Sequence, residues 1–170
     1  YKSEFETAFS EEHLILFGVN TLDNTQPETK VFNSLVIINN KFDVLFKYDK
    51  IKLVPFGEFL PFEKILSTIG IKKITEGYGS FSKGEKANIF LLDNLKLLPL
   101  ICYEIIFSEL SQNQYQKNLI VNISEDAWFG KTIGPHQHLA KAIFRSIENN
   151  VFLIRSANKI VSLSTLKFCI

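Results

Sequence analysis

Short apolar runs alternate with polar stretches along the chain and predict strands and helices in mixed order. Apolar runs bounded by turn-forming residues predict strands, and we expect these at residues 13–19, 31–39, 42–48, 87–93, 96–101, 118–123, 151–156 and 160–163. Apolar residues at helical spacing predict helices, and we expect these at residues 2–12, 62–69, 104–110 and 134–147. We expect a polar turn from Asn20 to Lys30 and an exposed, glycine-rich loop at 77–84.

Strands joined partly by hairpins and partly by helices indicate an α/β layered fold with mixed sheets. Asn40 and Lys41 separate two strand patterns by two residues, which is compatible with a hairpin. Asn94 separates another such pair, whereas helix patterns separate the later strands. A chain of 170 residues can bury one core, so we expect a single domain, residues 1–170.

The composition excludes some classes of partner. The net charge is +1 and charged residues make up 22% of the chain, whereas a nucleic-acid-binding face needs an excess of Lys and Arg. Two cysteines, Cys102 and Cys169, are too few for a small disulfide framework, and we expect free thiols. No apolar run approaches the ~20 residues of a membrane span. We therefore expect the chain by itself to be soluble and cytoplasmic.

Cys102 stands where a strand pattern gives way to a helix pattern. Residues 95–101 are apolar enough for a buried strand, and Ile105, Ile106 and Leu110 then recur at helical spacing. At the carboxyl end of a strand such a turn can face a cleft, and the amino end of the next helix favours a thiolate. Cys102 is therefore a candidate nucleophile, although free cysteine is also a common small core residue.

Two irregular segments carry residue types that suit a functional site. Residues 48–61 combine charge with two prolines and a glycine, which argues against a helix or strand interior, and they include Lys50 and Glu58. Residues 124–131 follow an apolar run and contain Trp128, the only tryptophan of the chain. Loops that carry large aromatics beside charges are more often sites than cores.

These segments, in this order, resemble the nitrilase superfamily and, within it, the family of apolipoprotein N-acyltransferases. The resemblance lies in residues 48–61 around Lys50, in 101–106 around Cys102 and in the long segment 124–138, and it continues through 145–148 and 155–158. It implies an αββα layered sandwich with mixed sheets. Such a domain normally needs more than 170 residues, so the resemblance also implies an incomplete domain, truncated at both ends.

The resemblance implies separate catalytic roles for a thiol and an amine. Members of that family use a glutamate, a lysine and a cysteine to move an acyl chain from a phospholipid to the amino-terminal cysteine of a lipoprotein. Cys102 would be the nucleophile that forms a thioester, and Lys50 would stabilise the thiolate and the oxyanion.

Four further residues match positions of the family's motifs. Glu58 and Glu104 could each position Lys50 or the substrate amine, or form a salt bridge that holds the loop. Tyr103, beside Cys102, is implied as a supporting residue. Trp128 either walls an acyl-chain groove or caps the core.

The sequence also departs from the family's pattern. The base glutamate of the family lies in a strand-end motif, and the nearest match here is Glu6, within residues 2–12 that we expect to be the end of a helix. A glutamate at the end of a helix cannot supply that base. Glu125 stands where the family usually has asparagine, and His136 where an aromatic residue is usual.

The sequence predicts no metal and no cofactor. His136 and His138 are two residues apart at a predicted helix start, so their side chains point to different faces. No Cys, Asp or Glu completes a tetrahedral set at zinc-like spacing.

Three functional readings stay open. The first is a piece of an apolipoprotein N-acyltransferase, inactive alone, whose phospholipid donor and lipoprotein acceptor meet the intact enzyme at the inner membrane. Its catalytic domain would face the periplasm, and this chain would reach the membrane only through missing segments. The second is a nitrilase-type amidase that uses the same thiol on a small amide. The third is a non-catalytic remnant or binding module.

Overall fold

The computed structural model describes residues 2–25, 27–62, 80–112, 116–158 and 163–165, which divide into two compact units. The first unit is Tyr1–Glu85 and the second is Lys86–Ile170. Residues 63–69 of the predicted helix and residues 160–162 of the predicted strand lie outside the described residues.

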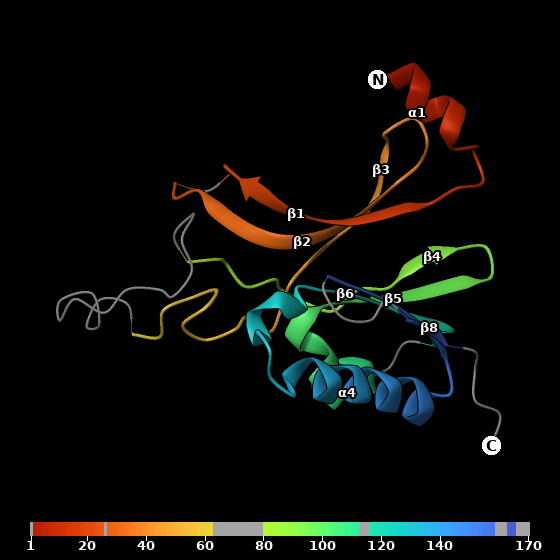
Figure 1. The fold of residues 1–170 in the computed structure, drawn as a ribbon. Helices are drawn as coiled ribbons and strands as arrows, with labels where there is room; N and C mark the ends of the chain where they lie inside the picture. The colour runs from red at the N-terminus through yellow and green to blue at the C-terminus, as the bar shows by residue number, and fades with distance from the viewer. Residues whose placement is uncertain (1, 26, 63–79, 113–115, 159–162, 166–170) are drawn as a thin grey trace. The chain divides into compact units, whose positions relative to one another are not determined.

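The first unit is built on a three-stranded antiparallel sheet in the order β1-β2-β3 (Figure 1). Its strands are β1 (Ile15–Asp23), β2 (Lys30–Ile38) and β3 (Val44–Asp49). The central strand β2 is buried from Ser34 to Ile38, and these residues form the core of the sheet. The predicted hairpin is confirmed, but its connection spans 39–43, and the register between β2 and β3 shifts at Ile37 and Ile38.

The predicted polar turn from Asn20 to Lys30 is too long. Strand β1 continues to Asp23 and pairs residue by residue with β2 as far as Asp23 with Lys30, so the turn is limited to 24–29. Most of β1 is exposed to solvent. Polar side chains in such a strand stay hydrated, so they do not disturb the backbone hydrogen bonds to β2. Before β1, the short helix α1 (Lys2–Ala8) confirms the prediction for the first residues and carries Glu6.

Within the first unit, backbone hydrogen bonds join residues 80–84 to earlier segments of the chain. The amides of Phe81 and Ser82 donate to the carbonyls of Glu58 and Val31. The Gly84 amide donates to the Lys50 carbonyl at 2.9 Å, and Gly84 is buried. The expectation of an exposed loop is therefore wrong for Gly84, and residues 77–79 lie outside the described part of the chain.

The second unit contains a five-stranded mixed sheet in the order β4-β5-β6-β7-β8. Strands β5 (Leu95–Ile101), β6 (Leu119–Ser124) and β7 (Phe152–Ala157) are parallel, and β4 (Phe90–Leu92) and β8 (Leu163–Thr165) pair antiparallel at the two edges. Leu97, Leu100, Ile120 and Leu153 are fully buried and form the centre of the core. The sheet has the mixed pairing that the sequence predicts.

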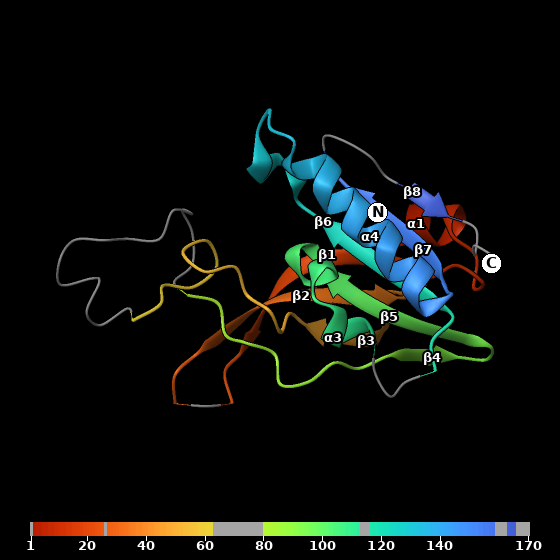
Figure 2. The ribbon, with the colours of Figure 1, turned by 90° about the horizontal axis from the view of Figure 1, so that it is seen from below.

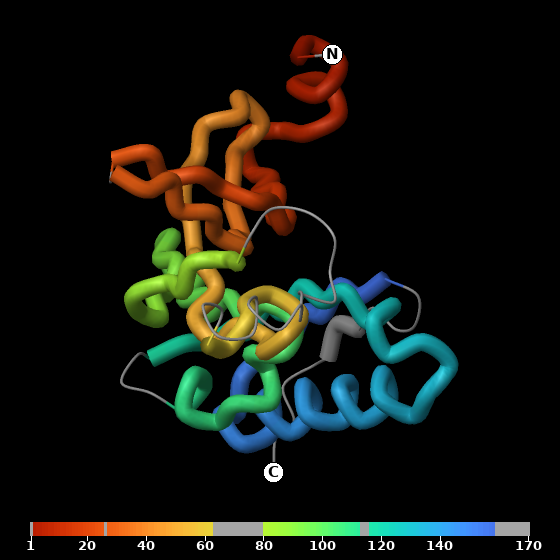
Figure 3. The backbone as a smooth tube through the Cα atoms, turned by 90° about the vertical axis from the view of Figure 1, so that its left-hand side faces the viewer, coloured from red at the N-terminus to blue at the C-terminus, as the bar shows by residue number. Residues whose placement is uncertain are grey.

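Helix α4 (Gly134–Asn149) packs along one face of this sheet (Figure 2) and confirms the helix predicted at 134–147. Pro135 opens the helix, where its missing N–H costs nothing. Asn150 closes it in the left-handed conformation (φ 52°, ψ 49°), which asparagine tolerates well. Residues 130–133 lead from η3 (Asp126–Phe129) into α4, which the backbone trace in Figure 3 shows as a regular coil in blue.

The single helix predicted at 104–110 is wrong. A 3-10 helix, η2 (Cys102–Ile106), is followed by extended backbone at Phe107 (φ −87°, ψ 107°) and then by one helical turn, α3 (Ser108–Ser111). The amide of Phe107 bonds the Glu104 carbonyl three residues back, so the α-helical series does not start. Among the helices that the structure describes, none has the length and apolar character needed to cross a bilayer.

Candidate active site

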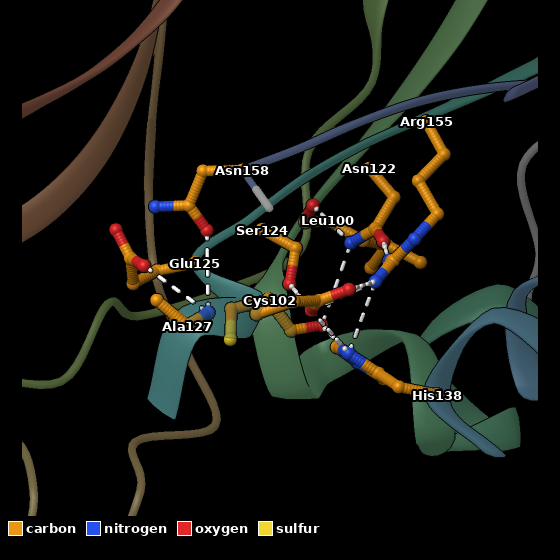
Figure 4. Close-up of polar contacts among 10 residues, drawn as sticks. Leu100, Cys102, Asn122, Ser124, Glu125, Ala127, His138, Arg155 and Asn158 are labelled. Atoms are coloured by element: carbon orange, nitrogen blue, oxygen red, sulfur yellow. Dashed lines mark hydrogen bonds and ion pairs between the residues drawn. The ribbon is translucent and has the colours of Figure 1, made fainter. Parts of the chain in front are cut away.

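Cys102 follows the last residue of β5 and adopts a left-handed backbone conformation with φ of 50°. Left-handed backbone costs a residue with a Cβ roughly 1–2 kcal/mol, and such strain gathers at functional sites where surrounding contacts hold it. The thiol is free and half-buried. Figure 4 shows the sulfur pointing away from His138, whereas the carbonyl oxygen of Cys102 points toward the imidazole.

Two buried side chains hold the carbonyl groups on either side of Ile101. His138 Nε2 lies 3.1 Å from the Cys102 carbonyl oxygen. Asn122 Nδ2 donates to the Leu100 carbonyl at 2.9 Å and, more weakly, to that of Cys102 at 3.4 Å. The turn that carries the thiol is thus fixed by β6 and α4 as well as by its own strand (Figure 4).

A buried ion pair supports these two side chains. Arg155 Nη2 donates to both carboxylate oxygens of Asp126, at 2.9 and 2.7 Å, and lies 3.1 Å from His138 Nδ1. Arg155 Nη1 donates to the Asn122 side-chain oxygen, and Ser124 donates its hydroxyl to Asp126 at 2.7 Å. Because charged hydrogen bonds in a buried site are strong, this cluster holds Asn122 and His138 in fixed orientations.

The cluster also sets the charge states of Asp126 and His138. Burial acts to raise the pKa of Asp126, but its polar contacts with Ser124, His138 and Arg155 outweigh burial and hold this pKa below its usual value. Burial lowers the pKa of His138, and the neighbouring Asp126 only partly opposes that effect. His138 is therefore neutral at pH 7. Its single ring proton can face the Cys102 carbonyl through Nε2 or the Asp126 carboxylate through Nδ1.

Glu104 is fully buried beneath the Cys102 turn. Its carboxylate accepts a 2.8 Å hydrogen bond from the Ile101 amide, the last amide of β5. The side chain therefore closes the turn that begins at the end of the strand.

Tyr103 and Trp128 lie in the same unit but differ in their surroundings. Tyr103 is half-buried and packs edge-on against Phe107, with ring centres 4.9 Å apart. Trp128 leaves 60% of its surface exposed on η3, which does not fit a residue that caps the core. Its place in an acyl-chain groove stays a prediction.

In the first unit, Lys50 forms a buried ion pair with Glu58. The Lys50 amine is 1% exposed and lies 2.8 Å from both carboxylate oxygens of Glu58. Asn33 and the Val54 amide also donate to this carboxylate, at 2.7 and 2.8 Å. Glu58 therefore contacts Lys50 and, through the Val54 amide, also holds the loop that carries it.

The predicted site residues thus fall into two groups. Lys50 and Glu58 belong to the first unit, and Cys102, Tyr103, Glu104 and Trp128 belong to the second. The approach of the Lys50 amine to the Cys102 sulfur stays a prediction. Glu6 is exposed on α1, 3.9 Å from Lys2, as expected for a helix residue.

Sequence reasoning missed the cluster beneath Cys102, whose members are Asn122, Ser124, Asp126, His138 and Arg155. A signal was present in β7, where strand periodicity places Arg155 on the same buried face as Leu153. A buried arginine requires an anionic partner. The expected divergence of His136 and His138 is seen, because His136 is exposed and His138 is buried. Within the described residues, no three side chains of His, Cys, Asp or Glu gather as a metal site.

A family model described as carbon-nitrogen hydrolase matches residues 7–168. The chain therefore belongs to the carbon-nitrogen hydrolase family.

Two relatives share one name. The chain is 40% identical over 156 residues to apolipoprotein N-acyltransferase of Rhizobium rhizogenes, covering 89% of this chain and 29% of the relative. It is 43% identical over 136 residues to the protein of the same name from Rhizobium leguminosarum, covering 79% of this chain and 26% of the relative. The chain thus spans between a quarter and a third of the length of these curated relatives, and the predicted resemblance is confirmed.

Solved structures confirm the fold class. An amidase from Nesterenkonia sp. AN1 matches 92% of this chain and 53% of its own, with a TM-score of 0.55 and 18% identity. A glutamine-dependent NAD+ synthetase from Acinetobacter baumannii matches 91% of this chain and 25% of its own, with a TM-score of 0.61 and 18% identity. At this identity the likeness concerns the fold alone, and it agrees with the nitrilase-like α/β class that the sequence predicts.

Proposed function

We propose that this chain carries the nucleophile and the lysine of an apolipoprotein N-acyltransferase. The substrates are a phospholipid as acyl donor and a lipoprotein with an amino-terminal cysteine as acceptor. The observation that carries the proposal is Cys102, a strained thiol at the end of β5 in a chain about 40% identical to enzymes of that name.

The reaction proceeds in two balanced steps. The Cys102 sulfur attacks the ester carbonyl of the donor, an S–C bond forms, the C–O bond breaks, and the thiol proton leaves with the lysophospholipid alcohol. The amino group of the acceptor then attacks the thioester, an amide forms, and the thiol is regenerated with the proton of the amine. Each tetrahedral intermediate carries an oxyanion that needs a donor.

Lys50 is the proposed donor for that oxyanion. Its amine forms an ion pair with Glu58, and the Glu58 carboxylate is in turn held by Asn33 and the Val54 amide. A cation held by buried partners keeps its position during the reaction and loses little energy to reorganisation. Glu58 is therefore a positioning residue for Lys50 in this scheme.

The location of the proposed substrates indicates where the intact enzyme works. Phospholipid and lipoprotein both lie in a membrane, so the intact enzyme works at the inner membrane with this region facing the periplasm. Trp128 and Ile133, exposed by 60% and 64% around η3, supply apolar surface to an acyl chain.

A chimera tests the proposal. The segment of the R. rhizogenes relative that matches this chain is replaced by it, and acyl transfer from phospholipid to a lipoprotein acceptor is measured in membranes. We expect turnover that is lost by 10³-fold or more in the Cys102→Ser and Lys50→Ala variants and unchanged in Cys169→Ser.

The controls separate the three readings. We expect the 170-residue chain alone to show no turnover, because we expect that Glu6, exposed on α1, does not act as the base. Hydrolysis of simple amides without acyl transfer in the chimera would support the amidase reading. Equal activity of the Cys102→Ser chimera and its parent would rule out the proposed nucleophile.

A further inference from the structure

We propose that His138 is a positioning residue for the nucleophile, because its Nε2–H holds the Cys102 carbonyl and thereby the left-handed turn that presents the thiol. This inference rests on the proposed role of Cys102 in acyl transfer. It goes beyond that role by assigning the geometry of the thiol to a side chain 36 residues further along the chain.

The first step concerns the backbone of Cys102. The carbonyl oxygen of a residue lies in the peptide plane that follows it, so a fixed oxygen fixes ψ of that residue. Asn122 holds the Leu100 carbonyl and His138 the Cys102 carbonyl, at 2.9 and 3.1 Å. With the oxygens before and after Ile101 both held, the backbone cannot relax to the extended form that would prolong β5.

The second step concerns the direction of the imidazole. His138 and Asp126 are both buried, and Asp126 Oδ1 lies 2.9 Å from Nδ1. Arg155 bridges the two, with Nη2 donating to Asp126 and lying 3.1 Å from Nδ1. Because the guanidinium nitrogen has only N–H donors, we assign the ring lone pair to Nδ1, facing Arg155, and the ring proton to Nε2, facing the Cys102 carbonyl (Figure 4).

The third step concerns the energetic balance. The left-handed backbone conformation of Cys102 persists only where contacts with surrounding residues outweigh its strain energy. The residues that do so come from three elements that all follow Cys102: Asp126 from η3, His138 from the first turns of α4 and Arg155 from β7. Their conformations are locked by burial and by charge, which suits a positioning role.

Two substitutions of His138 separate this role from packing. The amide nitrogen of glutamine superimposes on Nε2, whereas that of asparagine reaches only as far as Nδ1. Both variants remove the ring, but only His138→Gln keeps a donor for the Cys102 carbonyl.

The measurement is the rate of Cys102 alkylation by iodoacetamide in the 170-residue chain. Cys169 serves as the internal reference, and Trp128 fluorescence reports folding. We expect His138→Asn to slow Cys102 alkylation roughly tenfold or more, because misplaced reacting atoms cost rate steeply, and His138→Gln to remain within about threefold of the wild type. If His138 acts only through packing, both variants should loosen the fold around Cys102. The Cys102 alkylation rate should then rise in both toward that of the urea-unfolded chain.

Two results would overturn the proposal. One is equal alkylation rates for His138→Gln and His138→Asn. The other is a nitrogen NMR spectrum of the wild-type chain in which His138 carries its proton only on Nδ1, and this measurement holds even if a variant fails to fold. Neither experiment uses phospholipid or lipoprotein, so a failure here is distinct from a failure of acyl transfer in the chimera.

Discussion

At the scale of single residues, burial separates two lysines that both form close ion pairs. Lys50 is almost fully buried against Glu58 at 2.8 Å, whereas Lys41 meets Glu11 at 2.6 Å on an exposed surface. The shorter pair, Lys41 with Glu11, contributes less to stability, because water screens an exposed ion pair. A buried charge, in contrast, depends on its partner.

Replacing Lys50 should therefore destabilise the first unit by about 3 kcal/mol, since Lys50→Met leaves the Glu58 carboxylate without its cation. Hydrogen exchange of the β2 amides measures this loss within the unit itself. Lys41→Met is the matched control, for which we expect no measurable change. The double variant Lys50→Met with Glu58→Leu should recover part of the loss, and equal effects of the two single variants would contradict the argument.

At the scale of elements, Gly84 shows how one backbone contact joins two segments distant in sequence. A Cβ at this position would overlap the carbonyl oxygen of Asp49 and lie 2.8 Å from the carbonyl carbon, at the end of β3. The Gly84 amide also bonds the Lys50 carbonyl. Glycine is needed here for close approach of backbone to backbone.

We expect Gly84→Ala to cost about 1–3 kcal/mol of stability in the first unit, because the strand end must shift to admit the methyl group. Gly57→Ala is the control, since its nearest neighbour is a Val54 side-chain atom at 3.3 Å that can rotate. Hydrogen exchange of β2 distinguishes the two variants. Equal protection in both would show that residues near Asp49 adapt freely.

The elements also show what the sequence could and could not predict. Turn residues and apolar runs located the hairpin at Asn94 and the helix α4, because these signals are local. The same reasoning failed at 104–110, where Ile105, Ile106 and Leu110 have helical spacing but Phe107 is extended. It also missed the partners of Arg155, since their contacts join residues far apart in the chain.

At the scale of the whole chain, the buried cluster beneath Cys102 couples stability of the second unit to pH. The pKa of His138 lies below its ordinary value of 6.5, first because of burial and despite Asp126. Below pH 6.5 the unfolded chain therefore binds a proton that the folded chain does not bind, and acid favours unfolding. The lowered pKa of Asp126 acts in the same direction, but only at pH values near or below 3.8.

The second unit should accordingly lose stability as the pH falls from 7.5 to 5.5, and His138 should cause much of that loss. Urea unfolding followed by Trp128 fluorescence measures it, because Trp128 is the only tryptophan and lies in this unit. We expect His138→Gln to flatten the pH dependence, since glutamine does not titrate. His136→Gln, an exposed neighbour on the same helix, should keep the wild-type dependence. An unchanged dependence in His138→Gln would mean that His138 binds its proton equally well in the folded and unfolded chain, contrary to its burial beside Arg155.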